Sequence, residues 1–275
     1  MNFHLPPFAA ETIFTIAGFP VTNALINSVI TTLFFVVIAL LVNSRLNRGY
    51  AKTTSLPDRF MNFMESVIEM ILPLFDQVTR SRKLTLKFLP LVGSLFFFIL
   101  ISNWSGLLPG IGTIGYYHEH DGAMTLVPFF RPSNTDFNLT FAMAIVSVVA
   151  SHVVGFAVVG FWKYFNKFIK IGDLWHAIIS LNPAKIMTAV IEFFVGLLEI
   201  VSEIAKLASL SLRLFGNVFA GEVLLSVIGA IFAAFLPLPF MFLEIIVGVV
   251  QATVFSMLVL VYLTIAVSEP HEASH

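Results

Sequence analysis

The chain has 275 residues, of which 58% are hydrophobic and only 11% charged, and its formal net charge is −1. Soluble domains carry about 25% charged residues, so lipid must cover most of the surface of this chain. The near-neutral charge excludes the basic footprint that nucleic-acid binding requires. Because the sequence contains no cysteine, it also excludes disulfides, thiol redox chemistry and thiolate metal sites.

Long apolar runs dominate the sequence. A helix that spans the hydrocarbon needs roughly 20 apolar residues, and three runs meet this length: 21–42, 88–108 and 137–162. Two prolines within four residues, Pro237 and Pro239, interrupt a fourth and much longer apolar region, and such a pair ends a helix. The pattern therefore predicts a hairpin of two long helices, 184–235 and 240–267. Because a helix of ~50 residues is ~75 Å long, the first must tilt, bend or run partly along the interface.

Residues 57–80 have a different pattern. Their apolar side chains recur at helical spacing on one side, and charged side chains occupy the other. This is typical of a helix that lies in the membrane interface, here with a kink expected near Pro73. We therefore expect an all-α membrane protein with five membrane-crossing helices and one interfacial helix. Residues 1–20 are expected to form an extracytoplasmic segment, and 21–275 a single polytopic domain without internal repeats.

The basic residues set the expected orientation. Twelve of the 15 lysine and arginine residues fall in two segments, after the first and third spans, and the positive-inside rule makes these segments cytoplasmic. They are Arg45, Arg48, Lys52, Arg59, Arg80, Arg82, Lys83, Lys87, Lys163, Lys167, Lys170 and Lys185. The N-terminus is then outside and the C-terminus inside. Arg131 alone falls on the outer side, where the run 118–121 (HEHD) is expected in an exposed loop.

The last two basic residues, Lys206 and Arg213, lie within the first hairpin helix. A charged side chain in mid-membrane costs ~2.5–3.5 kcal/mol, so a helix that carries several must use them. Four other polar residues fall within about 40° of Arg213 on a helix and form one stripe with it: Glu199, Lys206, Ser209 and Asn217. Gly216 and Ala220, on or near this face, leave room for a neighbouring backbone to come close.

A second polar surface lies on the other side of Arg213. Glu222 is about 180° round the helix from Arg213. Two polar surfaces arranged in this way have the geometry of two half-paths offset across an arginine barrier. On the second hairpin helix, Glu244 and Gln251 are seven residues apart and share a face. One antiparallel register brings Gln251 level with Arg213 and Glu244 level with Glu222.

Residues 211–222 read SLRLFGNVFAGE and resemble the signature of the a subunit of the membrane sector of bacterial F-type ATP synthases. Other stretches resemble the same family: 103–109 (NWSGLLP), 131–140 (RPSNTDFNLT), and Gln251 followed by VYL at 261–263. The resemblance covers roughly 91–267. One position departs from the best-known bacterial pattern, because Glu244 stands where a histidine precedes the glutamine by seven residues. The entry path is therefore expected to contain two carboxylates.

The resemblance implies a stator channel subunit that couples proton flow to rotation and ATP synthesis. Arg213 would be the essential stator charge, facing a rotating ring of c subunits that each carry a mid-membrane carboxylate. The outer half-channel would comprise Glu222, Glu244, Asn217 and Gln251, and the cytoplasmic one Glu199, Glu203 and Ser209.

The same resemblance implies a place and partners for the chain. It would be a multi-pass protein of the bacterial inner membrane. Its partners would be the c-subunit ring, b-type peripheral stalk subunits, the remaining ATP synthase subunits and membrane lipid. We expect no nucleic acid, no cofactor, no metal and no catalytic nucleotide site in this chain.

Several of these charged residues also fit a structural role. Lys206 is spaced to neutralise Glu203 or Glu199, which would leave it no part in transport. Glu222 and Glu244 would form a structural pair if they share one proton across the hairpin. These alternatives stay open at the level of sequence.

Three residues of the third span also have two interpretations. His152, midway along the span, is an intramembrane ionisable group with either a water-lined or a structural role. Asp136 and Asn138 begin the span and fit the proton path or a helix cap. The alternative function for the whole chain is a self-contained proton-coupled secondary transporter, a class that usually has paired repeats and discontinuous helices.

Overall fold

The computed structural model describes residues 7, 9–46, 56–108, 110–120, 123–160, 164, 179, 183–231 and 235–268. In chain order the elements are β1 (Thr12–Ile16), β2 (Phe19–Thr22), α1 (Asn23–Leu46), α2 (Leu56–Thr79), α3 (Arg82–Ser105), the short helix η1 (Ile111–Thr113), β3 (Gly115–His120), β4 (Ala123–Pro128), the short helix η2 (Ser133–Thr135), α4 (Phe137–Val159), α7 (Pro183–Ile231) and α8 (Pro237–Val267). Some of the basic residues that set the expected orientation lie outside the described residues: Arg48, Lys52, Lys163, Lys167 and Lys170.

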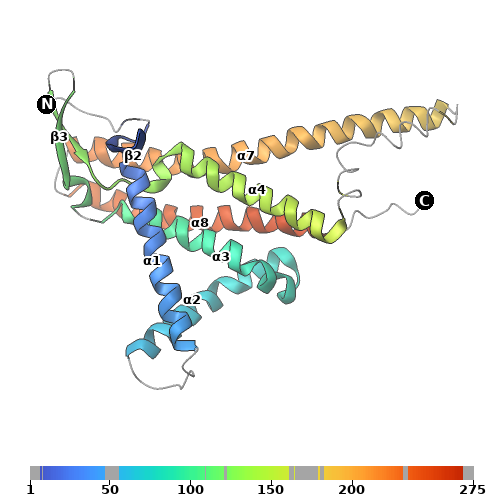
Figure 1. Ribbon diagram of the computed structural model, residues 1–275, viewed down its shortest axis with the longest axis horizontal. Coiled ribbons are helices and arrows are strands. Elements are labelled where there is room, and N and C mark those ends of the chain that lie inside the picture. The colour runs from blue at the N-terminus through green and yellow to red at the C-terminus, as the bar shows by residue number, and fades with distance from the viewer. Residues whose placement is uncertain are drawn as a thin grey trace.

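Among the residues that the structure describes, five helices are long and apolar enough to cross a membrane, namely α1, α3, α4, α7 and α8. This confirms the five predicted spans and the all-α class. α2 forms in the segment for which an interfacial helix was predicted, with Pro73 inside it. α7 has 49 residues, many more than the roughly 20 that a bilayer core requires. Figure 1 shows its N-terminal part extending beyond the other helices of the bundle.

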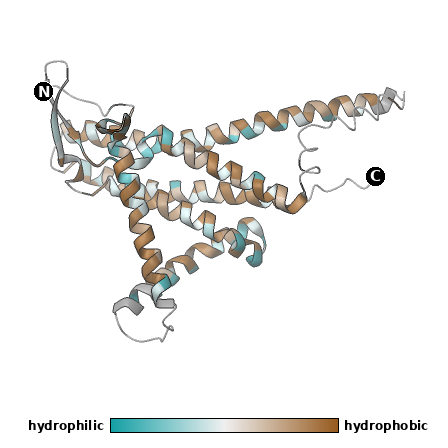
Figure 2. Ribbon diagram, viewed as in Figure 1, coloured by the Kyte–Doolittle hydropathy of each residue, from teal (hydrophilic) through white to brown (hydrophobic). Residues whose placement is uncertain are grey.

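The helices form a bundle with one outlying member. α8 packs against α2, α3, α4 and α7, and α4 also packs along α7. α1 contacts α3 and η2 and runs away from the bundle at a steep angle (Figure 1). Figure 2 shows that α1 is hydrophobic along almost its whole length, and its side chains stay exposed, with Leu40 at 62%. An apolar helix that is exposed in this way is suited to contact with lipid.

The hairpin break differs from its prediction. Both prolines were expected to lie in the turn, but Pro237 and Pro239 lie in the first turn of α8. The first helical turn is where proline is tolerated best, because its missing N–H would have no intrahelical acceptor there. α8 therefore starts three residues earlier than predicted, and α7 ends at Ile231.

The start of the second span is also earlier than predicted. α3 begins at Arg82 rather than near residue 88, so Lys83 and Lys87 belong to its first turns. Long basic side chains can lie along an apolar helix end while their charge stays in the interface. Apolar composition alone therefore placed this boundary too late.

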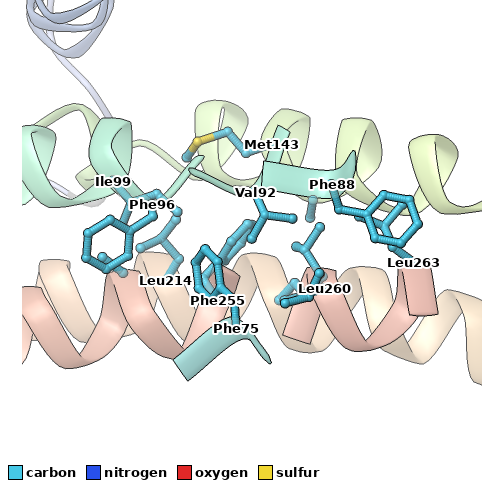
Figure 3. Packing of buried hydrophobic residues seen from close by; sticks show 14 of the residues in the cluster. Phe75, Phe88, Val92, Phe96, Ile99, Met143, Leu214, Phe255, Leu260 and Leu263 are labelled. Atoms are coloured by element: carbon cyan, nitrogen blue, oxygen red, sulfur yellow. The ribbon is translucent and has the colours of Figure 1, made fainter. Parts of the chain in front are cut away.

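The buried core lies where α2, α3, α4, α7 and α8 meet. Along α8 the buried side chains recur at helical spacing and face the other helices: Ala252, Phe255, Val259, Leu260 and Leu263. Figure 3 shows Phe255, Leu260 and Leu263 of this set against side chains of α3 and against Phe75 of α2. Phe75 is fully buried. α2 is thus anchored to the bundle by its apolar face.

Two antiparallel hairpins, which were not predicted, lie at one end of the bundle. β1 pairs with β2, and β3 pairs with β4 from Gly115 opposite Pro128 to His120 opposite Ala123. The expectation of an exposed loop at 118–121 is therefore wrong for His118 to His120, which belong to β3. Asp121 lies outside the described residues. The sequence signal was weak because six-residue strands show too little alternation to stand out between apolar spans.

Candidate functional site

The polar stripe of α7 lies on one uninterrupted helix. Ser209, Arg213 and Asn217 are spaced by single turns, and all three are exposed. The Arg213 Nη2 donates a hydrogen bond to the Ser209 hydroxyl at 3.2 Å. In the described part of the chain no carboxylate lies within ion-pair distance of Arg213. Gly216 and Ala220 on the same side are also exposed, so α7 presents a charged surface lined by small residues.

A hydrogen bond between two side-chain amides connects α8, the second hairpin helix, to this stripe. The Asn217 Nδ2 donates to the Gln251 Oε1 at 3.1 Å. Gln251 is only 4% exposed, and its Nε2 has no acceptor among the described residues. The sequence placed Gln251 level with Arg213, whereas the structure places it level with Asn217, one turn further on.

Glu244 approaches α7 at Gly221. A side-chain carbon at Gly221 would overlap the Glu244 carboxylate, so this glycine provides the space that the carboxylate fills. Glu244 therefore lies beside the backbone next to Glu222, close to the predicted level. The two acids do not form the structural pair considered above, because Glu222 has a different partner.

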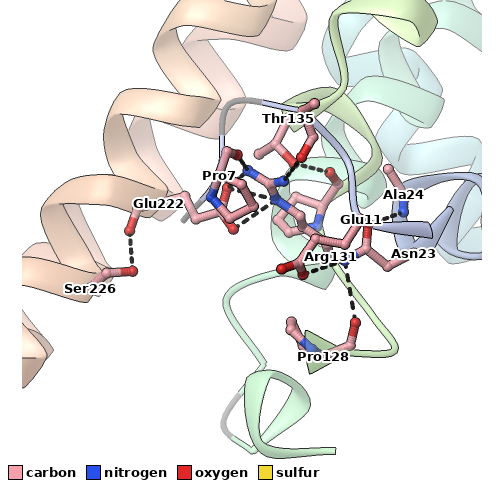
Figure 4. A network of polar contacts seen from close by, with 11 residues as sticks. Pro7, Glu11, Asn23, Ala24, Pro128, Arg131, Thr135, Glu222 and Ser226 are labelled. Atoms are coloured by element: carbon pink, nitrogen blue, oxygen red, sulfur yellow. Dashed lines mark hydrogen bonds and ion pairs between the residues drawn. The ribbon is translucent and has the colours of Figure 1, made fainter. Parts of the chain in front are cut away.

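That partner is Arg131, which sequence reasoning did not select. Its guanidinium donates from Nε to both Glu222 carboxylate oxygens, at 2.9 and 3.0 Å, and from Nη2 to Oε2 at 2.9 Å. Two backbone carbonyls take its remaining hydrogen bonds, Ala9 at 3.3 Å and Pro7 at 2.9 Å. Figure 4 shows this guanidinium in a polar network that links α7 to the N-terminal segment. Arg131 is 3% exposed.

The loop that carries Arg131 is itself fixed by asparagines. Asn27 of α1 donates to the Arg131 carbonyl oxygen at 3.0 Å and to the Ser105 hydroxyl at 2.8 Å. Asn134 donates to the Asn103 side-chain oxygen at 2.6 Å. These bonds connect α1, α3 and the loop before α4, so Arg131 is held in place from both sides.

The remaining charged residues of α7 lie on the other side of Arg213. The Lys206 Nζ forms an ion pair with one carboxylate oxygen of Glu203 at 2.7 Å. The second oxygen of Glu203 lies 3.6 Å from the His152 Nε2 of α4. Lys206 therefore neutralises Glu203, as its structural interpretation requires. Glu199 is half-buried one turn earlier on the same helix.

Comparison with known proteins identifies the family of the chain. The model described as ATP synthase A chain matches residues 25–264. The chain belongs to the ATP synthase A chain family. It is accordingly a multi-pass, ion-translocating subunit of the membrane sector of a bacterial F-type ATP synthase.

Individual members of the ATP synthase A chain family resemble the chain over most of its length. The ATP synthase subunit a of Trichlorobacter lovleyi is 32% identical over 255 residues, covering 91% of each chain. That of Syntrophobacter fumaroxidans is 33% identical over 217 residues, or 78% of this chain and 74% of the relative. The sodium-ion-specific ATP synthase subunit a of Propionigenium modestum is 27% identical over 258 residues, or 94% and 78%.

The last two candidate residues of the chain, Asp136 and Asn138, lie at the start of α4. Asp136 is the N-cap of α4, and its side chain accepts a hydrogen bond from the Asn138 N–H at 2.9 Å. This is the bond that an N-cap makes, and it supports the capping interpretation of Asp136. Within the described residues no group of three His, Asp or Glu side chains is placed to hold a metal ion.

Proposed function

We propose that the chain is the stator channel subunit of a proton-driven F-type ATP synthase. It provides two offset half-paths to a rotating ring of c subunits and couples proton flow to rotation and ATP synthesis. A b-type peripheral stalk would hold it against rotation. The match to the ATP synthase A chain family leaves no reason to retain the self-contained secondary transporter, whose paired repeats are also missing from the sequence.

The observation that carries the proposal is the isolation of Arg213. Glu222 is paired with Arg131 and Glu203 with Lys206, so the nearest acids of α7 already have cations. Arg213 has only the Ser209 hydroxyl within the described part of the chain. An unpaired charge in mid-membrane costs ~2.5–3.5 kcal/mol. We infer that its counter-charge is a carboxylate on another chain, which reaches it across the small-residue surface.

Arg213 then acts on each ring carboxylate that comes close. A fixed positive charge favours the ionised form of a carboxylate, so a protonated ring site loses its proton as it approaches. Arginine suits this task because its guanidinium stays protonated. The same charge repels protons and prevents direct passage between the half-paths.

The two half-paths lie on either side of Arg213 along α7. The outer one comprises Glu222, Glu244, Asn217 and Gln251, and it is supported by the contact of Glu244 with Gly221 and by the Asn217–Gln251 bond. The inner one comprises Glu199, Glu203 and Ser209.

The positive-inside rule gives the proposed orientation, with the N-terminal segment outside and the C-terminus in the cytoplasm. Because the chain lacks cysteine, single cysteines report without background. Ala123→Cys should be labelled by an impermeant reagent from outside and Ser81→Cys from the cytoplasm. Labelling of both from one side would overturn the orientation.

Crosslinking tests whether the partner of Arg213 is a c subunit. A cysteine at Ser209 or Asn217 should form a disulfide with a cysteine placed beside the c-subunit carboxylate. Ala208→Cys is the matched control, because Ala208 is also exposed but points about 100° away from Ser209. Crosslinks that stay within this chain, or equal crosslinking from Ala208→Cys, would refute the proposed interface.

A further inference from the structure

Two acids lie at the outer end of the hairpin, and only one of them has a cation beside it. The Glu222 carboxylate accepts three hydrogen bonds of 2.9–3.0 Å from the Arg131 guanidinium. Glu244, whose carboxylate fills the space beside Gly221, has no hydrogen bond or ion pair to any described residue. Gly221 directly precedes Glu222, so the two acids belong to one level of the hairpin but differ in their partners.

The Arg131 guanidinium has little freedom to leave Glu222. The Arg131 side chain is 2% exposed, and its remaining hydrogen bonds go to the backbone carbonyl oxygens of Ala9 and Pro7, as Figure 4 shows. Asn27 of α1 donates to the Arg131 carbonyl oxygen at 3.0 Å. The N-terminal segment, α1 and α7 therefore fix this cation together, and it cannot turn to another anion.

A proton on Glu222 would leave this buried cation without its anion. The guanidinium cannot compensate by losing its own proton, and a buried charge that has lost its partner is strongly destabilising. Proton binding at Glu222 therefore works against the ion pair with Arg131. The pair as a whole is electrically neutral, so it adds no net charge to this level of the hairpin.

Glu244 has none of these constraints. Its protonation breaks no ion pair among the described residues, and it removes a net charge from a membrane-spanning helix, where charge is costly. The side chain is partly exposed, and no donor in the described part of the chain occupies either carboxylate oxygen. Both oxygens of Glu244 therefore remain available to bind a proton.

The elements packed on α8 determine which charges face Glu244. α8 itself carries no other charged residue. The Trp104 N–H of α3 donates to the carbonyl oxygen of the residue after Glu244, at 3.2 Å, and α4 begins with Asp136, which caps its own helix. α2 packs on α8 further along, in the core of Figure 3. Among the described residues, the charged side chains placed next to Glu244 are therefore those of the Glu222–Arg131 pair.

We propose that Glu244 alone carries the proton at this level of the outer half-path, and that Arg131 is a positioning residue that keeps Glu222 as a fixed anion. Glu244 binds a proton that arrives from the outer side and becomes neutral. It is ionised again when that proton passes on to a carboxylate of the ring. The inference rests on the proposed function, in which both acids belong to the outer half-path, and it assigns them different tasks there.

The test is proton conduction through the assembled membrane sector in inverted vesicles stripped of the catalytic sector. Their lumen faces the outer side, so the trapped buffer sets the pH at the outer half-path, and rates are normalised to assembled complex. The parental rate should follow the titration of one carboxyl group. Glu244→Gln should lose that dependence, and because proton-transfer groups contribute ~10²–10⁴-fold, we expect conduction to fall at least about tenfold. A parental rate or an unchanged profile in Glu244→Gln overturns the inference.

Substitutions of the ion pair test the role of Arg131. Glu222→Gln leaves the cation, which favours the ionised form of a nearby carboxyl group, so the midpoint of the profile should move to lower pH. Arg131→Met leaves the anion, and the midpoint should move to higher pH. The double variant removes a neutral pair and should return the midpoint to its parental value. A purely structural pair would not produce opposite shifts, so unmoved midpoints, or shifts in one direction only, contradict the inference. Glu222→Gln and the double variant decide the question if Arg131→Met does not assemble.

Arg82→Met is the matched control, because it also removes the cation of an arginine–carboxylate pair, with Asp76, but outside the hairpin. It should leave the midpoint unmoved, and a shift there as well would overturn the assignment to Arg131. Arg213→Ala separates the two levels of the argument. Retained ATP synthesis in that variant refutes the proposed function, whereas its loss together with an unshifted Glu222→Gln profile refutes only the separate roles of the two acids.

Discussion

Arg131 binds α7 through Glu222 and Arg213 belongs to α7, and the surroundings of these two arginines are opposite. Arg131 is 3% exposed, and its guanidinium is bonded to Glu222 and to two backbone carbonyls. Arg213 is exposed and bonded to a single hydroxyl within the described residues. The first side chain has its hydrogen bonds and its counter-charge inside the chain. Within the described residues the second bonds neither a carboxylate nor a backbone carbonyl, and it lies on a surface that small residues leave open.

The difference separates an arginine that builds the fold from one that acts on a partner. A buried guanidinium is tolerated when an anion and several acceptors surround it, and Arg131 meets this condition. An intramembrane arginine that lacks these partners within its own chain is available to an anion on another chain. Each prediction below tests whether the two arginines differ in this way.

The largest expected effect is on ATP synthesis in Arg213→Ala. The variant should abolish proton-driven synthesis and leave a passive proton leak, because no other permanent charge separates the half-paths. Arg213→Lys should also fail or nearly fail, since an ammonium lacks the planar fork and can lose its proton. Synthesis and passive proton flux are measured in inverted vesicles. Arg82→Ala, which removes an arginine from the exposed pair with Asp76, is the control and should behave like the parent. Near-parental synthesis in Arg213→Ala would refute the stator mechanism.

Arg131→Met should affect stability first. It leaves the Glu222 carboxylate without its counter-charge, and removing one partner of a buried pair costs about 3–5 kcal/mol. We expect a lower yield of assembled complex and a lower thermal unfolding temperature. The double variant Arg131→Met with Glu222→Gln removes both charges and should recover much of the stability. If the single variant is as stable as the parent, Arg131 does not have the structural role assigned here.

The sequence predicted the spans and the Arg213 stripe because both depend on local spacing. Apolar length identifies a spanning helix, and the helical period brings Glu199, Ser209, Arg213 and Asn217 to one face. The same reasoning placed the hairpin break among the prolines, within a few residues of its position. It put Pro237 and Pro239 in the turn because a proline pair ends a helix as readily as it begins one.

The pairing of Arg131 with Glu222 could not be read from spacing, because 91 positions separate the two residues. A signal was nevertheless present. Arg131 is the one basic residue in the segment between the second and third spans, and Glu222 is an acid within an apolar helix that has no cation at helical spacing after it. Matching these two isolated charges would have suggested the pair. The predicted hairpin register also missed the contact of Gln251 with Asn217 by one turn.

Glu222→Gln and Glu244→Gln test the same distinction between structure and transport on two acids. Both should slow ATP synthesis without opening a leak, because they impair delivery to the ring and leave Arg213 in place. The effect of Glu222→Gln should be the larger one, since it also leaves the buried Arg131 without its anion. Glu244→Gln should leave thermal stability close to parental. Synthesis rate, passive flux and unfolding temperature are measured on each variant, and a leak in either would place the barrier outside Arg213.

The smallest expected effect is at Asp136, where the same criterion applies to an acid. The carboxylate already accepts the Asn138 N–H, so we expect it to stabilise the start of α4 and to have no part in transport. Asparagine caps a helix about as well as aspartate, whereas alanine costs ~1 kcal/mol. Asp136→Asn should therefore match the parent in stability and synthesis, and Asp136→Ala should unfold at a slightly lower temperature while its synthesis rate is kept. Normal stability with impaired synthesis in Asp136→Asn would mean that the charge itself is needed. Asp136 would then belong to the outer half-path despite its bond to the backbone, and a satisfied side chain would no longer identify a purely structural residue in this protein.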